Sequence, residues 1–192
     1  MVATMTVRLR ETNRAELVAH FLSLEGEDRR LRFGSFIADA GIHEYVARID
    51  FERDGVFAVQ DDDLKLVGVV HAAFSAKNAE LGLSVLPGYR AQGVGNVLFA
   101  RAVMHLRNRG AREVFVHCLT ENAAMMHISR KHGMRLVQEG SESEARLKIE
   151  PATSETLLAE LLHEHGSAAV SIARHGRQLA RSLRQMFAVP AR

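Results

Sequence analysis

The sequence predicts one mixed α/β domain of the α+β class over residues 5–150, followed by a helical, basic C-terminal appendage over residues 151–192. Three observations predict this architecture. Strand-like and helix-like segments follow one another in the order βααβββαβαββ, which a regularly alternating βα fold would not give. A glycine-rich turn joins a strand to a long helix near the middle of the chain. After Pro151 the strand-like pattern ends, and only helical spacing continues.

The composition is that of an ordinary globular domain. The chain has 192 residues, of which 47% are apolar and 25% are charged, enough for one domain with a real core. No run reaches the roughly 18 apolar residues of a membrane span, and the start has no apolar segment of signal-peptide length. The one cysteine, Cys118, excludes an internal disulfide. The sequence therefore predicts a cytoplasmic protein without membrane association.

The first half of the domain combines short strands with helices. We expect a strand at residues 7–11 and helices at residues 14–24 and 28–49, the latter with a break near Gly41. The segments "GVFAVQ" and "LKLVGVVHAAF" predict two strands, and the polar "DDD" between them suits an antiparallel hairpin. "AELGLSV" predicts a third strand.

The second half begins with a helix predicted at residues 93–109. It stops at Gly110, and its last turn carries Arg107 and Arg109, where cations suit the helix dipole. "EVFVHCL" then predicts a strand and "ENAAMMHISRKHG" a helix. "MRLVQ" and "ARLKIE" predict a closing pair of strands.

The appendage combines apolar periodicity with positive charge. Thr153 or Ser154 can cap a helix, and apolar residues then recur at helical spacing: Leu157, Leu158, Leu161, Leu162, Ile172, Leu179, Leu183 and Phe187. Residues 166–192 hold five arginines and no acidic residue. We expect the apolar face to be buried against the domain or against a second subunit, so a homodimer through these helices stays open. Nucleic-acid binding is disfavoured, because no aromatic residues interleave with Arg174 to Arg184.

The stretch "LSVLPGYRAQGVGNVLFARAV" predicts a phosphate cradle, because a glycine-rich turn into a helix leaves backbone N–H groups for a bulky anion. A P-loop is excluded, since Val94 and Gly95 stand where lysine and a hydroxyl residue would be needed. A dinucleotide fingerprint is excluded, since Leu98 occupies the position of its third glycine.

A third design fits these residues. "RAQGVG" matches the R/Q-x-x-G-x-G/A loop of the GCN5-related N-acetyltransferases (the GNAT family), and "ENAAMMHISRKHGMR" resembles the family's later N-x-x-A-x-x-L-Y-x-K-x-G-F segment. The resemblance covers roughly residues 5–150 and is strongest over 80–134. It implies a central mixed, mostly antiparallel sheet of six to seven strands, flanked by about four helices.

The resemblance also implies acetyl-CoA as co-substrate. The pyrophosphate would lie against the loop, with Arg90 supplying charge beside Gln92, Gly93, Val94, Gly95 and Asn96. The strand edge from Leu83 to Val85 would pair with the pantetheine arm. Asn122 would donate an amide hydrogen bond to the same molecule, cap its helix, or do both. No histidine pair has the HExxH spacing, so no metal site is predicted.

The implied reaction is direct attack of a primary amine on the thioester of acetyl-CoA. An amine with a pKa near 10.4 is about 0.1% neutral near pH 7.4, so a general base is useful. Glu80 matches the family glutamate that serves as base in protein-acetylating members. The family tyrosine that protonates the departing thiolate is replaced by Ser129. This departure keeps a second interpretation open, a non-catalytic regulatory domain that binds acyl-CoA.

Two other side chains and the acceptor complete the expectations. Cys118 lies among apolar residues and is interpreted as a small core residue and not as a nucleophile. His117, beside it, is the histidine most worth testing as a proton carrier. The acceptor is a protein lysine or a small-molecule amine. "LEGEDRRLRFGSF" loosely resembles a segment of bacterial protein lysine acetyltransferases, which favours a protein acceptor only weakly.

Overall fold

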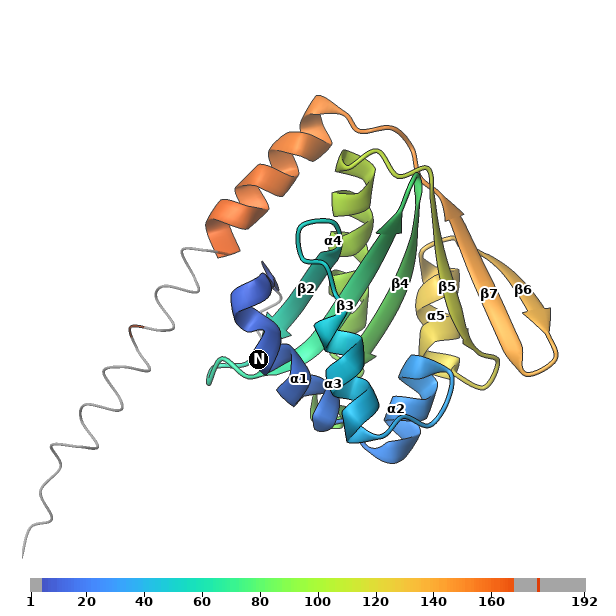
Figure 1. The fold of residues 1–192 in the computed structure, drawn as a ribbon. Coiled ribbons are helices and arrows are strands. Elements are labelled where there is room, and N and C mark those ends of the chain that lie inside the picture. Colours follow the sequence, from blue (N-terminus) through green and yellow to red (C-terminus); the bar gives the residue numbers. More distant parts are fainter. Residues whose placement is uncertain (1–4, 168–175, 177–192) are drawn as a thin grey trace, which may run out of the picture.

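The computed structural model describes residues 5–167 and Gly176, so the predicted helical stretch from Ile172 to Phe187 lies, apart from Gly176, outside the described residues. Within the described part, seven strands form one sheet in the order β1-β2-β3-β4-β5-β7-β6 (Figure 1). Neighbouring strands are antiparallel except β4 and β5. The α+β class and the mostly antiparallel sheet are thereby confirmed.

Most strands lie close to their predicted positions, but the first ends at Arg8 and not at Glu11, where a 3-10 turn begins. They are β1 (Thr6–Arg8), β2 (Gly55–Gln60), β3 (Leu66–Ser75), β4 (Asn78–Val85), β5 (Glu113–Leu119), β6 (Arg135–Glu139) and β7 (Glu142–Lys148). The turn between β2 and β3 is the antiparallel hairpin that "DDD" predicts. Asp61 stabilises this turn, because its carboxylate accepts from the N–H groups of Asp63 and Lys65.

Helices cover both faces of the sheet. They are α1 (Arg14–Leu22), α2 (Gly26–Phe33), α3 (Asp39–Ala47), α4 (Val94–Asn108) and α5 (Ala123–Lys131), joined by 3-10 turns at Glu11–Asn13 and Pro87–Tyr89. The first three lie on one face, and α4 and α5 lie on the other (Figure 1). Each face has its own apolar core, one including Leu17, Phe21 and Val46, the other including Leu98, Phe99 and Ile128.

The predicted helix at residues 28–49 is two helices. The break lies at Gly34, which ends α2 in the left-handed conformation with φ of 76°. Gly41, predicted to mark the break, lies inside α3. An added Cβ at Gly41 would lie 2.7 Å from Ile37 Cγ1. The prediction was wrong because Gly41 provides room for packing, whereas Gly34 provides the backbone conformation that terminates a helix.

Strands β4 and β5 are parallel neighbours over only a short length. Their register pairs Asn78 with Glu113, Ala79 with Val114 and Glu80 with Phe115. Beyond Glu80 the ladder ends, while β4 stays paired with β3 and β5 stays paired with β7. The two strands therefore diverge toward their carboxyl ends, and a space opens in the middle of the sheet.

Residues 154–167 form a further helix that lies beside α4 (Figure 1). Thr153 caps it, since its hydroxyl accepts from the N–H of Thr156. Four leucines of this helix keep 51–63% of their surface exposed: Leu157, Leu158, Leu161 and Leu162. These four leucines are therefore not buried against the domain, and burial of the apolar face against a second subunit stays a prediction.

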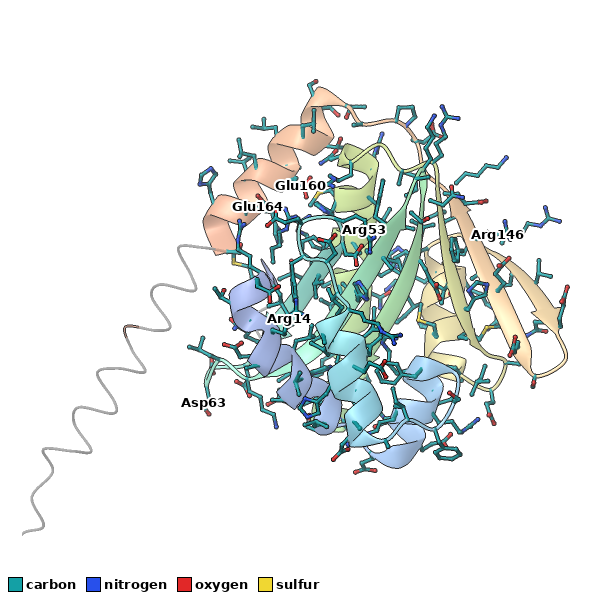
Figure 2. All side chains as sticks on the ribbon, viewed as in Figure 1. Arg14, Arg53, Asp63, Arg146, Glu160 and Glu164 are labelled. Carbon is teal, nitrogen blue, oxygen red and sulfur yellow. The ribbon has the colours of Figure 1, made fainter. Side chains whose placement is uncertain are left out.

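The helix instead contacts the domain through its polar side. The Glu160 carboxylate lies 2.7 Å from Arg101 and 2.8 Å from His105, and it accepts from Asn108. The Arg101 guanidinium is buried and lies 4.2 Å from the centre of the Phe57 ring. Figure 2 shows Glu160 and Glu164 on the side of the helix that faces α4. No described helix is both long and apolar enough to cross a membrane.

A buried histidine joins α1 to the sheet. His20 is 2% exposed, its Nδ1 lies 2.9 Å from the carbonyl oxygen of Leu66, and its Nε2 lies 2.8 Å from Ser84 Oγ. Because a carbonyl only accepts, Nδ1 donates, and a neutral ring accepts from Ser84 at Nε2. Burial lowers the pKa of His20 from 6.5 to about 4.

This pKa shift predicts acid sensitivity. The unfolded chain takes up a proton at His20 below about pH 6.5, whereas the folded chain takes it up only near pH 4. The contribution of His20 to the free energy of unfolding is therefore fully present above pH 6.5. It is lost as the pH drops to 4, by about 3 kcal/mol for a shift of this size. We expect urea unfolding of His20→Gln to show a flatter slope against pH over that window than wild type. The exposed control His43→Gln should keep the wild-type slope; equal slopes in both variants would contradict this account.

Candidate functional site

The glycine-rich turn leads from β4 into α4. Gly93 is the N-cap residue of α4 and takes φ of 82°, which favours glycine. The first hydrogen bond of the helix runs from the N–H of Val97 to the carbonyl of Gly93. The N–H groups of Val94, Gly95 and Asn96 precede it and have no partner within the helix. Free N–H groups at the start of a long helix are the geometry that favours an anion.

The two glycines of the loop have different surroundings. A Cβ added at Gly93 would meet no heavy atom within 4 Å, so open space lies beside the helix start. A Cβ added at Gly95 would lie 2.8 Å from Ile128 Cδ1, so Gly95 lets α4 approach α5. Gly93 therefore leaves room for a ligand, and Gly95 brings together the two helices that flank it.

The polar side chains of the loop are held by local contacts. Arg90 donates to the carbonyl of Val85 and lies 2.6 Å from the Asp28 carboxylate. Gln92 donates to the carbonyl of Gly88. The amide oxygen of Asn96 is buried and has no hydrogen-bond partner among the described residues. These contacts fix the shape of the loop, and the amide oxygen of Asn96 is an acceptor without a partner among the described residues.

Asn122 lies at the start of α5, across from the loop. Its side-chain oxygen accepts from the N–H of Met125, which confirms the helix cap, and its nitrogen donates to the carbonyl of Leu31 in α2. Leu83 and Val85 are partly buried in the part of β4 that has left the ladder with β5. Leu83 and Val85 thus lie where β4 has separated from β5, and Asn122 joins the start of α5 to α2.

A cleft of about 820 Å³ lies at this divergence. Its floor includes Leu81 and Gly82 of β4 and Cys118 of β5, and its walls include charged side chains. These are Arg32, Glu80, His117, Glu139, Glu142, Glu144 and Arg146. Four carboxylates face two guanidinium groups and one imidazole, so the lining favours a cationic ligand.

Glu80 and His117 lie next to each other in this cleft. His117 Nδ1 is 3.4 Å from Glu80 Oε1, and its Nε2 is 2.8 Å from Glu144 Oε2. Carboxylates only accept, so both bonds form only when the ring carries two protons. Hydrogen bonding from Arg146 is the main cause that lowers the pKa of Glu144, and His117 adds to it. Glu80 itself is half exposed, open to a ligand in the cleft.

Ser129 and Cys118 occupy less accessible positions. Ser129 is fully buried in α5, and its hydroxyl has no hydrogen-bond partner among the described residues. It does not line the cleft. Cys118 is 7% exposed within the apolar core, and burial raises the pKa of its thiol, as expected for a core residue. A catalytic part for Ser129 stays a prediction.

Four polar residues beside the cleft were not predicted as site residues from the sequence: Arg32, Tyr45, Asp54 and His71. The Tyr45 hydroxyl lies 2.7 Å from His71 Nδ1, and His71 Nε2 lies 3.1 Å from Asp54 Oδ2. Arg32 lies over Gly82, where an added Cβ would overlap its guanidinium. The residues come from separate elements, so no local motif marks them. The one signal in the sequence was His71, a histidine within an apolar strand segment.

Comparison with known proteins identifies the class. The model of the acetyltransferase (GNAT) family matches residues 25–134, and the chain belongs to this family. It is similar to the streptothricin acetyltransferase of Streptomyces lavendulae, with 32% identity over 80 residues, which is 40% of this chain and 42% of that protein. The chain thus matches less than half the length of this relative.

Solved structures share the fold at low sequence identity. The GNAT domain of S. lividans PAT has a TM-score of 0.64 and 17% identity, and the likeness covers 75% of this chain and 89% of that one. PaiA N-acetyltransferase from Thermoplasma acidophilum, solved in complex with coenzyme A, has a TM-score of 0.57 and 16% identity, with 74% and 97% covered. These likenesses establish the GNAT fold.

Proposed function

We propose that this protein transfers an acetyl group from acetyl-CoA to a primary amine of a protein lysine or a small molecule, by direct attack in a ternary complex. The observation that carries the proposal is the divergence of β4 and β5 beside a glycine-capped helix start. A helix start suited to an anion, a strand edge released from its neighbour and a charged cleft support this proposal.

The loop fits the diphosphate of coenzyme A. Open space beside Gly93 admits a bulky group, and the N–H groups of Val94, Gly95 and Asn96 can donate to its oxygens. Arg90 lies beside the loop, but its guanidinium is paired with the Asp28 carboxylate, so its positive charge reaches the diphosphate only if this ion pair opens. Leu83 and Val85 offer a strand edge to the amides of the pantetheine arm. Asn122 would contribute its remaining side-chain N–H, since one donates to Leu31.

The charge of the cleft supports an amine acceptor. Four carboxylates against two guanidinium groups attract a protonated amine. Such an amine must lose a proton before its lone pair can attack the thioester carbon. Glu80 is the candidate base, because its carboxylate lines the cleft, is half exposed and lies on the strand that borders the divergence.

Replacing Glu80 by Gln tests this assignment. We expect kcat to fall about tenfold or more, while the affinity for acetyl-CoA stays within twofold, because only proton transfer is lost. The loss should shrink at high pH, where the amine deprotonates without help. The matched control is Glu139→Gln, which lines the same cleft on β6. An unchanged pH–rate profile in Glu80→Gln would show that Glu80 is an ordinary strand residue and not the base.

The second candidate function is a regulatory domain that binds acyl-CoA without turnover. The burial of Ser129 at the position of the family's tyrosine favours it. Both functions require the ligand, so the first experiment is a calorimetric titration of the full chain with coenzyme A. Saturable binding supports the proposed site. Failure to bind at millimolar coenzyme A would exclude both functions.

A further inference from the structure

A chain of hydrogen bonds leads from the cleft into the interior. Tyr45 of α3 lines the cleft, and its hydroxyl lies 2.7 Å from Nδ1 of His71 in β3. His71 is 7% exposed, and its Nε2 lies 3.1 Å from the Asp54 carboxylate, which is 2% exposed. The chain has one accessible end, at the tyrosine, and one buried charged end, at the aspartate.

The donors and acceptors of this chain fix the protons on its members. Asp54 can only accept, so His71 Nε2 carries a hydrogen, and the neutral ring accepts at Nδ1. The Tyr45 hydroxyl therefore donates its hydrogen to His71. Arg32 donates to the same phenol oxygen over 2.8 Å. This order of base, imidazole and hydroxyl is the one that activates a hydroxyl group in catalytic triads.

Asp54 is built to hold a positive imidazole. Burial acts to raise the pKa of its carboxyl, but hydrogen bonds from His71, Arg53 and the N–H of Phe74 outweigh it and leave the pKa well below its usual value. The carboxylate is thus ionised throughout the neutral range. A proton that reaches His71 is stabilised by a buried negative charge.

We propose that Tyr45 is the catalytic proton carrier of the acyl transfer, with His71 as its proton acceptor and Asp54 as the residue that positions His71. This inference rests on the proposed function and deepens it. Tyr45 would supply a hydroxyl group at the cleft. The position where the family has its tyrosine holds the buried Ser129 in this protein.

The proton balance requires such a carrier. A protonated amine loses two protons as it becomes an amide, one before attack and one after the C–N bond has formed. Glu80 takes the first proton and passes it to water. The second goes to the Tyr45 oxygen while the tyrosine's own proton moves to His71 Nδ1. When the C–S bond breaks, Tyr45 gives a proton to the thiolate and recovers its own from His71.

The charged surroundings of Tyr45 favour proton movement toward His71. Arg32 from α2 stabilises negative charge on the phenol oxygen, and Asp54 stabilises positive charge on the imidazole. The other titratable or charged groups of the cleft lie on β4, β5, β6 and β7 and are Glu80, His117, Glu139, Glu142, Glu144 and Arg146. Arg53 contacts Asp54 from the turn before β2.

Two substitutions interrupt the chain at different points. Tyr45→Phe removes the hydroxyl and keeps the ring, which packs edge-on against Phe21 and Phe33. Asp54→Asn keeps the shape of the side chain, but its amide can donate to His71 Nε2 and so put the hydrogen on Nδ1. His71 can then no longer accept from Tyr45. If Asp54→Asn fails to fold, His71→Gln interrupts the chain at the same step.

The experiment measures thiol release from acetyl-CoA in the full chain, with an acceptor amine on which wild type turns over. We expect kcat to fall about 100-fold in Tyr45→Phe and at least tenfold in Asp54→Asn, with unchanged affinity for coenzyme A. The double variant should be no slower than Tyr45→Phe alone, because the two residues act as one unit. Tyr89→Phe, whose hydroxyl binds Asp61 in the β2–β3 turn, is the control and should keep wild-type turnover.

A purely structural role predicts different results. Independent losses of packing would multiply in the double variant and would leave the shape of the pH–rate profile unchanged. The inference is overturned if Tyr45→Phe stays within twofold of Tyr89→Phe, or if the two losses multiply. If wild type binds coenzyme A but releases no thiol with any amine, the proposed function fails first and this inference falls with it.

Discussion

Substitution of Gly93 by Asp is expected to abolish the stabilisation that coenzyme A gives to the wild-type protein. A ligand at a hundredfold its Kd stabilises the native state by about 2.7 kcal/mol. The new carboxylate would occupy the open space beside the helix start and repel the diphosphate. The measurement is thermal unfolding with and without coenzyme A, and the expected ligand-induced shift in the variant is close to zero.

Gly110→Asp is a matched control for this substitution. Gly110 follows the other end of α4, has φ of 79°, and an added Cβ there also meets no heavy atom within 4 Å. Both variants therefore suffer a similar backbone strain and gain the same charge. Gly110→Asp should melt lower than wild type but keep the ligand-induced shift. Equal shifts in the two variants would place the ligand away from the loop.

The largest effect on stability is expected from Glu160→Gln. The variant removes the charge that faces the buried guanidinium of Arg101, and losing one partner of a buried ion pair costs about 3 kcal/mol or more. Glu164 remains 3.2 Å from Arg101 and still faces its charge, so we expect the free energy of unfolding to fall by about 3 kcal/mol and not by more. For a chain of this size this corresponds to a decrease in Tm of roughly 6–12 °C.

The pH dependence of the same contact has a defined sign. Burial acts to raise the pKa of Glu160, but hydrogen bonds from His105, Asn108 and Arg101 lower it to about 2. Its contribution is thus present above the ordinary value of 4.5 and is lost as the pH falls toward 2. The exposed Glu155→Gln on the same helix is the control. Equal melting temperatures for both variants would show that this polar contact does not hold the helix.

The sequence was sufficient for the fold because its strongest signals are local. The strand at residues 113–119 and the glycine turn were predicted within a residue or two, since hydrophobic alternation and glycine placement act over short stretches. The break between α2 and α3 was misplaced because Gly34 and Gly41 look alike in sequence. Only the backbone angle at Gly34 distinguishes a helix terminus from a packing position.

The C-terminal helix shows how apolar spacing can mislead. Leu157 and Leu161 form the regular stripe that normally marks a buried face, yet this stripe is exposed. Thr156, Glu160 and His163 lie at equally helical spacing on the face that contacts the domain. This polar spacing is visible in the sequence. It indicates a contact face only once Arg101 and His105 of α4 are known to be its buried partners.

Some residues of the candidate site could be predicted from the sequence, and others could not. The loop around Gly93 and the glutamate at position 80 belong to contiguous motifs, so sequence alone could propose them. Tyr45, His71 and Asp54 come from three separate segments and meet only because α3 packs on the face of the sheet that carries His71. A hydrogen-bond chain of this kind is a property of tertiary packing.

Acetyl transfer is tested by product formation in the full chain with acetyl-CoA and a set of primary amines. The set should include lysine-containing peptides, polyamines and small-molecule amines, with free thiol and acetylated amine quantified together. We expect at least one amine to be acetylated, with one thiol released for each amide formed. Binding of coenzyme A without an acetylated product from any of these amines would contradict this expectation and support the non-catalytic alternative.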